Sequence, residues 1–176
     1  DIHLINLRTR MPFKYGIATM TRMPMAFVRV KVKINGASVT GVSSDLLPPK
    51  WFTKDPQKPV LDEIQDMLGV IQSACNLSMG MEAESVFALW RQLYEAQGRS
   101  EMGRRHPPLL AHFGTSLIER AMIEAFCRHA GKPFHDVVRT NELGVDLGTL
   151  HPELDAQRPG DLLPSKPLSQ VTARHT

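Results

Sequence analysis

The sequence has few of the features that mark secreted or membrane proteins. Only two cysteines occur, Cys75 and Cys127, and each lies inside a stretch with helical periodicity. Two such cysteines argue against a disulfide framework and favour buried, reduced thiols. No apolar run approaches the roughly 18 consecutive residues of a membrane span, and the N-terminus lacks the layout of a signal peptide. We therefore expect a soluble, cytoplasmic protein with no membrane partner.

Strong charge and specific catalytic motifs are also absent. The formal net charge is +3 over 176 residues, and the basic residues are scattered, so nucleic acid is not an expected partner. The sequence lacks the His-Glu-x-x-His, paired Cys-x-x-Cys, Gly-x-Ser-x-Gly and glycine-rich nucleotide motifs. Its seven histidines show no metal-ligand spacing. We therefore assign no catalytic residue and no metal ligand within this chain.

The length limits the domain organisation. A chain of 176 residues suffices for one domain, or for one domain and the start of another. A (β/α)₈ barrel alone needs about 250 residues, so a complete barrel with a second domain is excluded. The chain begins at Asp1 rather than methionine, and residues 168–176 resemble a strand without a partner. From these two features we expect a chain that has been cut.

Residues 1–44 have the pattern of β structure. Residues 2–7 predict a short first strand, and a loop is expected from Pro12 to Pro24. Residues 27–34 predict a second strand, with valines and Ile34 on one face and basic residues on the other. Asn35-Gly36 suits a type I′ turn, so residues 37–43 should return as a third strand. The result is a three-stranded antiparallel meander.

From Pro59 the apolar pattern changes to a helical period. The first helix carries one apolar stripe, made by Leu61, Ile64, Leu68, Ile71 and Cys75. A second helix is predicted at residues 82–97 with Gly98 as its stop, and a third at residues 108–130 with Gly131 as its cap. Small residues at positions 121 and 125 would let another element approach the third helix closely. The predicted fold class is therefore α+β, a meander followed by a helical bundle.

Charged residues of the third helix suggest no catalytic pair. Glu119 and Glu124 lie five residues apart, which points them in different directions around the helix axis. We expect them to form ion pairs with Arg120 or Arg128 instead.

Two predicted loops contain the residues best suited to bind a ligand. They cover residues 12–24 and 43–55, leave the same end of the small sheet, and are rich in aromatic, Met and Lys residues. One interpretation is a lid that closes over a ligand. The other is that Tyr15, Trp51 and Phe52 fold back as minor core. The sequence leaves both interpretations open.

Several short motifs occur in a distinctive order. Pro-Phe-Lys-Tyr-Gly at residues 12–16 precedes the Val-Arg-Val-Lys-Val strand and its Asn-Gly turn at residues 28–36, and Gly-Val-Ser-Ser follows at 41–44. The third helix carries Phe-Gly-Thr-Ser-Leu-Ile-Glu-Arg-Ala-Met-Ile-Glu-Ala at 113–125, and Ala-Gly-Lys-Pro-Phe follows at 130–134. In this order the motifs resemble the N-terminal capping domain of the mandelate racemase and muconate lactonizing enzyme branch of the enolase superfamily.

The resemblance implies a division of labour within a longer enzyme. Residues 1–140 would be the capping domain, and residues 141–176 a linker and the start of a truncated barrel domain. The parent enzyme would be an isomerase or lyase that uses Mg²⁺ to abstract a proton next to a carboxylate, as racemases, cycloisomerases and acid-sugar dehydratases do. Its metal ligands and catalytic residues would lie on the barrel, outside this chain. The partners implied are a small carboxylate or acid-sugar substrate, the absent barrel domain and further copies in a homo-oligomer.

In this family the cap contributes substrate specificity through its two loops. The matching positions imply a set of candidate substrate-binding residues, which are Phe13, Tyr15, Thr19, Met20, Arg22, Ser44, Lys50, Trp51 and Phe52. Lys31-Val-Lys33 matches the family's Lys-x-Lys motif in letters alone, because it precedes a hairpin turn. The stretch at 95–106 and Glu124 depart from the family pattern and leave the subgroup open. A second hypothesis is a stand-alone α+β module for ligand binding or dimerisation, without catalysis.

Overall fold

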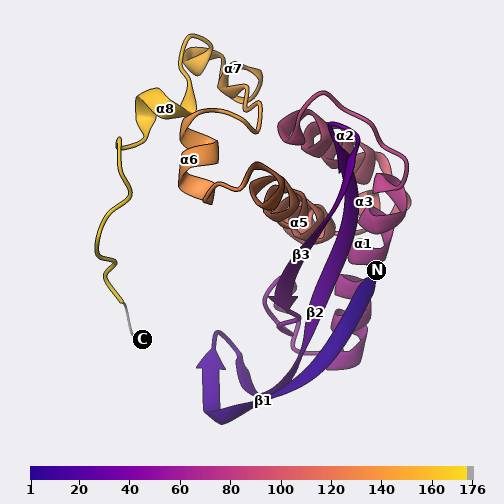
Figure 1. Ribbon diagram of the computed structural model, residues 1–176. Coiled ribbons are helices and arrows are strands. Elements are labelled where there is room, and N and C mark those ends of the chain that lie inside the picture. The colour runs from indigo at the N-terminus through magenta and orange to yellow at the C-terminus, as the bar shows by residue number, and fades with distance from the viewer. Residues whose placement is uncertain (174–176) are drawn as a thin grey trace.

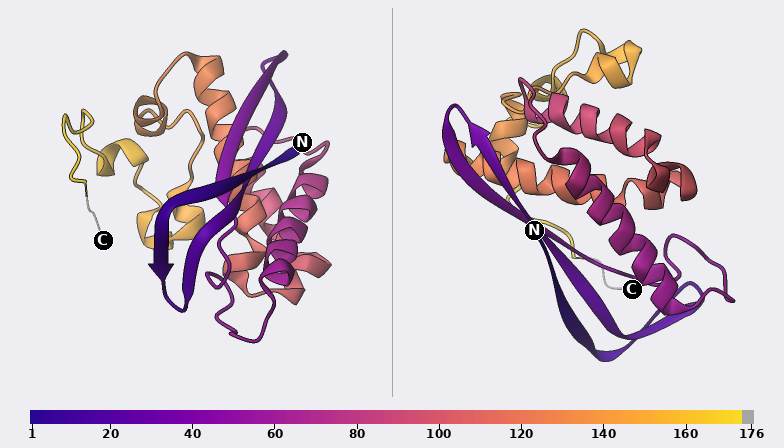
Figure 2. Two further views of the ribbon diagram at one scale, coloured as in Figure 1. Left: turned by 90° about the horizontal axis from the view of Figure 1, so that it is seen from below. Right: turned by 90° about the vertical axis from the view of Figure 1, so that its right-hand side faces the viewer.

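The computed structural model describes residues 1–173 and contains one open antiparallel sheet packed against helices (Figure 1). The sheet has the order β1-β2-β3, in which consecutive strands are neighbours. The strands are β1 (Ile2–Tyr15), β2 (Ala18–Ile34) and β3 (Ala37–Leu46). The helices cover one face of this sheet, as the right-hand view of Figure 2 shows. The predicted α+β fold, a meander followed by helices, is confirmed.

The turn between β2 and β3 has the expected conformation. Asn35 and Gly36 both have positive φ, 49° and 82°, as a type I′ turn requires, and Ile34 pairs with Ala37 across it. Val28 is fully buried beneath the helices, whereas Lys31 is exposed on the opposite face. The alternation predicted for this strand is therefore correct.

The loop predicted between Pro12 and Pro24 is wrong, because the two strands continue through it as a hairpin. Pairing resumes at Phe13 with Met20 after a register shift that begins at Arg8. Pro12 falls inside this irregular stretch of an edge strand, where a missing N–H is tolerated. The carbonyl of Pro24 accepts a hydrogen bond from the N–H of Leu47 (2.9 Å), the residue that follows β3. The N–H that proline lacks would lie on this same side, just beyond the end of β3, so no hydrogen bond of the sheet is lost.

Helical segments follow the sheet in the order that the sequence predicts, with different boundaries. The helices are α1 (Val60–Ser78), α2 (Val86–Arg99), α3 (Glu101–Arg105), α4 (Pro108–Ala111), α5 (Phe113–Ala130), α6 (Phe134–Arg139), α7 (Leu147–Leu150) and α8 (Pro159–Leu162), with a 3₁₀ turn, η1, at Pro152–Leu154. Gly98 lies inside α2 and does not end it. The predicted third helix is split at His112 (φ −91°, ψ 6°), whereas Gly131 caps α5 with φ 63° as expected.

The core lies between the sheet, α1 and α5. Gly41 on β3 packs directly against α5, where a Cβ atom at position 41 would lie 2.0 Å from the Ala121 carbonyl oxygen and 2.8 Å from the Ala125 Cβ. The two small residues therefore permit the close approach that their spacing predicted. The predicted apolar stripe of α1 is confirmed except at its first residue: Ile71 is fully buried and Ile64, Leu68 and Cys75 pack against the core, whereas Leu61 is 72% exposed. Met67 and Val70 are buried in addition.

One ion pair of α5 was predicted correctly. Arg128 pairs with Glu124, whose other carboxylate oxygen accepts a hydrogen bond from the Val42 N–H of β3 (3.1 Å). Arg120 pairs with Asp45 of β3 at 2.8 Å rather than with a glutamate of its own helix.

Residues 141–173 contain only short helical turns. Residues 168–173 form no strand, so the strand predicted at 168–176 is wrong over that part, and residues 174–176 lie outside the described residues. The boundary between two domains near residue 140 stays a prediction. Within the described residues, no helix is long and apolar enough to cross a membrane.

Candidate functional site

The end of the β1–β2 hairpin, residues 8–22, forms an arm that bends sharply from the rest of the sheet (Figure 2). Its side chains are exposed or half-buried throughout, in contrast to the buried Met23 that follows. Large apolar side chains are exposed on the arm, with Met11 at 65%, Phe13 at 47% and Ile17 at 61%. Exposed apolar groups gathered on one projecting element are typical of a contact surface.

The arm is also strongly basic. It carries Arg8, Arg10, Lys14 and Arg22 and no acidic residue. Arg8 and Arg22 are directly opposite each other in the strand register, an arrangement in which like charges repel. Within residues 1–173, none of these four cations forms an ion pair. The arm therefore favours an anionic ligand.

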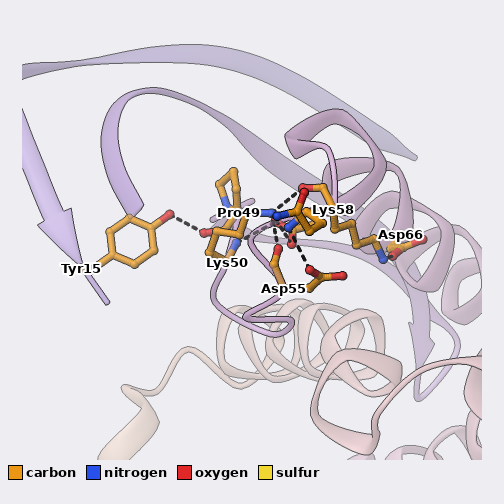
Figure 3. A network of polar contacts seen from close by, with 8 residues as sticks. Tyr15, Pro49, Lys50, Asp55, Lys58 and Asp66 are labelled. Carbon is orange, nitrogen blue, oxygen red and sulfur yellow. Dashed lines mark hydrogen bonds and ion pairs between the residues drawn. The ribbon is translucent and has the colours of Figure 1, made fainter. Parts of the chain in front are cut away.

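The second element of the site is the segment of residues 47–58, which lies beside the arm. It is held by Lys50, whose ammonium donates to the carbonyls of Asp55 (2.8 Å) and Lys58 and to a carboxylate oxygen of Glu63 (3.1 Å) (Figure 3). The backbone N–H of Lys50 donates to the other carboxylate oxygen of Glu63 (2.7 Å). Lys58 in turn pairs with Asp66 of α1. Two of the three lysines of the segment, Lys50 and Lys58, thus fasten it to α1.

A hydrogen bond and one ring contact join the arm to this segment. The Tyr15 hydroxyl donates to the Pro49 carbonyl (2.7 Å), as Figure 3 shows. The rings of Tyr15 and Trp51 have centroids 6.2 Å apart, and Phe13 stacks on Tyr15 at 6.0 Å. We call Phe13, Tyr15 and Trp51 the aromatic wall. Burial, reinforced by the negative charge of Glu63, raises the pKa of Tyr15 above its usual value of 10.0, so its hydroxyl remains a donor.

The other candidate residues from the sequence lie at varied distances from this wall. Thr19, Met20 and Arg22 are on the β2 side of the arm, with Met20 paired to Phe13. Phe52 turns inward and packs on Phe113 at 5.1 Å, so for this residue the core interpretation is the one that the contacts support. Ser44 lies within β3, where its carbonyl accepts a hydrogen bond from Arg120 (3.1 Å).

The ammonium group of Lys50 is fully engaged in contacts within the protein. Its three ammonium donors have three acceptors within the protein, and its side chain is only 11% exposed. The cavity beside Lys50 and Glu63 measures about 10 Å³, which is no more than the space of one water molecule. A ligand would therefore contact the outer side of this segment, where Trp51 is 56% exposed.

Glu63, which binds Lys50, is not among the site residues that the sequence predicts. It lies in the first turn of α1, where acidic residues are common at exposed positions, yet it is only 5% exposed. The available signal was its spacing: Glu63 precedes Met67 by four residues and Val70 by seven, on the buried stripe of α1.

The described residues contain no set of metal ligands. Across residues 1–173, no group of three or more His, Cys, Asp or Glu side chains is arranged so that it could hold a metal ion. These residues therefore do not fit Mg²⁺, and no chemical step through a metal is derived for them.

Comparisons with known proteins bear on the fold. No protein-family model matches the sequence, and no curated protein matches it significantly. Among solved structures, the chain is similar to a mandelate racemase/muconate lactonizing enzyme-like protein from Rubrobacter xylanophilus, with a TM-score of 0.52 and 16% sequence identity. The match covers 79% of this chain and 32% of that chain, so this chain corresponds to about a third of that protein. The likeness shows a shared fold, an open three-stranded sheet followed by helices, which is the fold class predicted from the sequence.

Proposed function

We propose that this chain is the substrate-selecting cap of a longer, Mg²⁺-dependent enzyme that abstracts a proton next to a carboxylate. The catalytic and metal-binding residues would belong to a barrel domain outside these 176 residues. The reaction would be of the racemase, cycloisomerase or acid-sugar dehydratase type. In this proposal the aromatic wall and the basic arm contact the substrate, and the rest of the chain supports them.

The unpaired cations of the arm carry this proposal. A small carboxylate or acid sugar presents an anion and an apolar or ring face. The arm carries four cations together with the rings of Phe13 and Tyr15, and Trp51 contacts Tyr15 from the neighbouring segment. The fold likeness to part of a mandelate racemase/muconate lactonizing enzyme-like protein supports the same assignment.

The test uses the full-length protein encoded by the natural gene. We expect it to exchange the proton next to the carboxylate with deuterium, in the presence of Mg²⁺, for at least one member of a panel of acid sugars and other small carboxylates. Arg22→Gln should lower kcat/KM about tenfold, which corresponds to about 1.4 kcal/mol for one charged contact. Arg99→Gln, at an arginine that is 74% exposed on α2, is the matched control and should change little. Equal effects of the two substitutions would contradict the proposed role of the arm.

The isolated chain provides a second test. With Mg²⁺ and the same panel, the 176-residue chain should show no turnover, because the proposal places catalysis elsewhere. Turnover by this chain alone would contradict the proposal.

The competing function is a stand-alone module for ligand binding or dimerisation. The uncovered face of the sheet favours it, since Ile5 and Val42 are 50% and 45% exposed there. The intact mass of the natural gene product separates the two: a cap with a barrel requires about 40 kDa or more, given about 250 residues for the barrel. A natural product of 19.7 kDa would favour the module.

A further inference from the structure

Lys50 occupies a backbone conformation that lysine rarely adopts. Its φ is +62°, and it follows Pro49 in a turn. Proline followed by a residue of positive φ is the arrangement of a type II turn, in which the second position is usually glycine. Side-chain-bearing residues in this region persist where surrounding contacts impose them. The contacts that impose it here can be identified.

The carboxylate of Glu63 is the group that holds Lys50 in this conformation. One of its oxygens accepts from the Lys50 backbone N–H (2.7 Å), and the other accepts from the Lys50 ammonium (3.1 Å). The buried carboxylate of Glu63 thus binds both the backbone N–H and the side-chain ammonium of Lys50. These two hydrogen bonds restrict the backbone conformation of Lys50. Glu63 itself is fixed, because it is 5% exposed in the first turns of α1.

The restricted turn determines where its neighbours lie. Trp51 follows Lys50 directly, and its ring lies 6.2 Å from that of Tyr15. Pro49 precedes Lys50, and its carbonyl accepts the Tyr15 hydroxyl (2.7 Å). Both contacts between the segment and the arm are therefore made by the immediate neighbours of the residue that Glu63 holds.

We propose that Glu63 is a positioning residue for the candidate site: by holding Lys50, it sets Trp51 and the Pro49 carbonyl against Tyr15, so that the arm and segment 47–58 form one preformed surface. The use of this surface for substrate rests on the proposed function, whereas the positioning does not. Preformed surfaces bind more tightly, because less conformational freedom is lost on binding.

The experiment measures the ring contact in the chain without any ligand. An NMR cross-relaxation (NOE) signal between the rings of Tyr15 and Trp51 is expected in the native chain, and Glu63→Gln should abolish it. Trp90→Phe assigns the two indole signals, since Trp51 and Trp90 are the chain's two tryptophans. The contact between Trp90 and Tyr94, 5.6 Å apart on α2, should persist in Glu63→Gln and reports that the chain remains folded.

Asp62→Asn is the matched control. Asp62 is an exposed acidic residue of the same helical turn, so its substitution removes the same charge from the α1 N-terminus without touching Lys50. It should leave the Tyr15–Trp51 signal intact. Loss of the signal in Asp62→Asn, or its persistence in Glu63→Gln, would overturn the proposal. Absence of the signal in the native chain would overturn it as well.

A double variant covers the case in which Glu63→Gln alone fails to fold. Lys50→Gly combined with Glu63→Leu leaves no buried charge unpaired, and glycine adopts positive φ without strain. Leucine at position 63 accepts no hydrogen bond from the backbone N–H of residue 50, so the turn is kept while its link to α1 is gone, and the ring contact should again be lost. Persistence of the signal in this variant would show that the turn alone positions Trp51. Since no substrate is present, none of these outcomes depends on whether the cap serves an enzyme.

Discussion

Buried polar side chains show how much a single residue decides in this protein. Gln97 of α2 is fully buried, yet its amide donates to the Ala111 carbonyl (2.9 Å) and its oxygen accepts from the Ser73 hydroxyl (2.9 Å). Ser43 is also buried, and its hydroxyl donates to the Leu117 carbonyl (2.6 Å). Because both groups have partners, burial carries no large penalty, and each one joins two elements of the core.

Two glycines allow a matched test of packing. Gly41→Ala should destabilise the fold by about 2 kcal/mol, because the new methyl group would overlap the backbone of α5 at Ala121. Gly98→Ala should stabilise it by about 0.5–1 kcal/mol, because the nearest atoms are 3.8 Å away and alanine favours the helix. Urea unfolding measures both. A gain in stability from Gly41→Ala would contradict the close approach of β3 and α5.

Glu119 should make stability depend on pH. Burial raises the pKa of its carboxyl above the usual 4.5, which Arg120 partly opposes. The folded state then holds the proton more tightly than the unfolded chain, so this contribution is complete below pH 4.5 and is lost as pH rises through the raised pKa. Glu119→Gln should therefore increase the free energy of unfolding near pH 7 and have little effect in acid, measured by urea unfolding at both pH values. The exposed Glu84→Gln is the control, and an equal gain there would refute the prediction.

At the scale of elements, the arm is the part whose structure differs most from its sequence pattern. Two prolines, Pro12 and Pro24, suggested a loop, yet the hairpin runs from Ile2 to Ile34. Both prolines occupy positions at which a missing N–H interrupts no ladder, one in an irregular stretch and one opposite the end of β3. Strand pairing then places Tyr15 and Arg22 on a projecting ribbon instead of a closing loop.

Removing the arm should leave the core intact. If Asn-Gly replaces residues 9–21, it joins Arg8 to Arg22, which already face each other in the register. The expected loss of stability is about 1 kcal/mol, chiefly from the hydrogen bond between Tyr15 and Pro49. Urea unfolding tests this, with Tyr15→Phe as the variant that removes the same hydrogen bond alone. A loss of several kcal/mol would show that the arm supports the core.

At the scale of the whole molecule, the helices cover only one face of the sheet (Figure 2). The opposite face carries exposed apolar side chains, among them Ile5, which is paired with Met25, and Val42. Within residues 1–173, β1 also has no strand on its outer edge. An uncovered apolar face with a free edge favours association with another surface.

The chain should therefore self-associate in solution. Ile5→Lys places a charge in the middle of the uncovered face and should shift the distribution towards monomer, as measured by sedimentation velocity over a range of concentrations. Leu168→Lys is the control, because Leu168 is 81% exposed in an irregular segment away from the sheet. A native chain that stays monomeric at high concentration would contradict this prediction.

The sequence by itself determined the elements whose signals lie within a few residues. The Asn35-Gly36 turn, the alternation around Val28 and the Gly131 cap depend on local backbone preference and on side-chain periodicity, and all three are confirmed. The aromatic residues of the site were also selected from the sequence, because Tyr15 and Trp51 stand out by composition. Their contact with each other was not predicted, since they are 36 positions apart.

Only the tertiary structure decided how the candidate site is built. Glu63 is 13 residues from Lys50 in the sequence, and its burial depends on which side of α1 faces the core. Phe52 turns towards Phe113, and Trp51 stays outside, although the two are neighbours of similar character. Which of these side chains is buried depends on how segments distant in sequence pack together. The free energy of burying a side chain depends on the space that its neighbours in the fold leave for it.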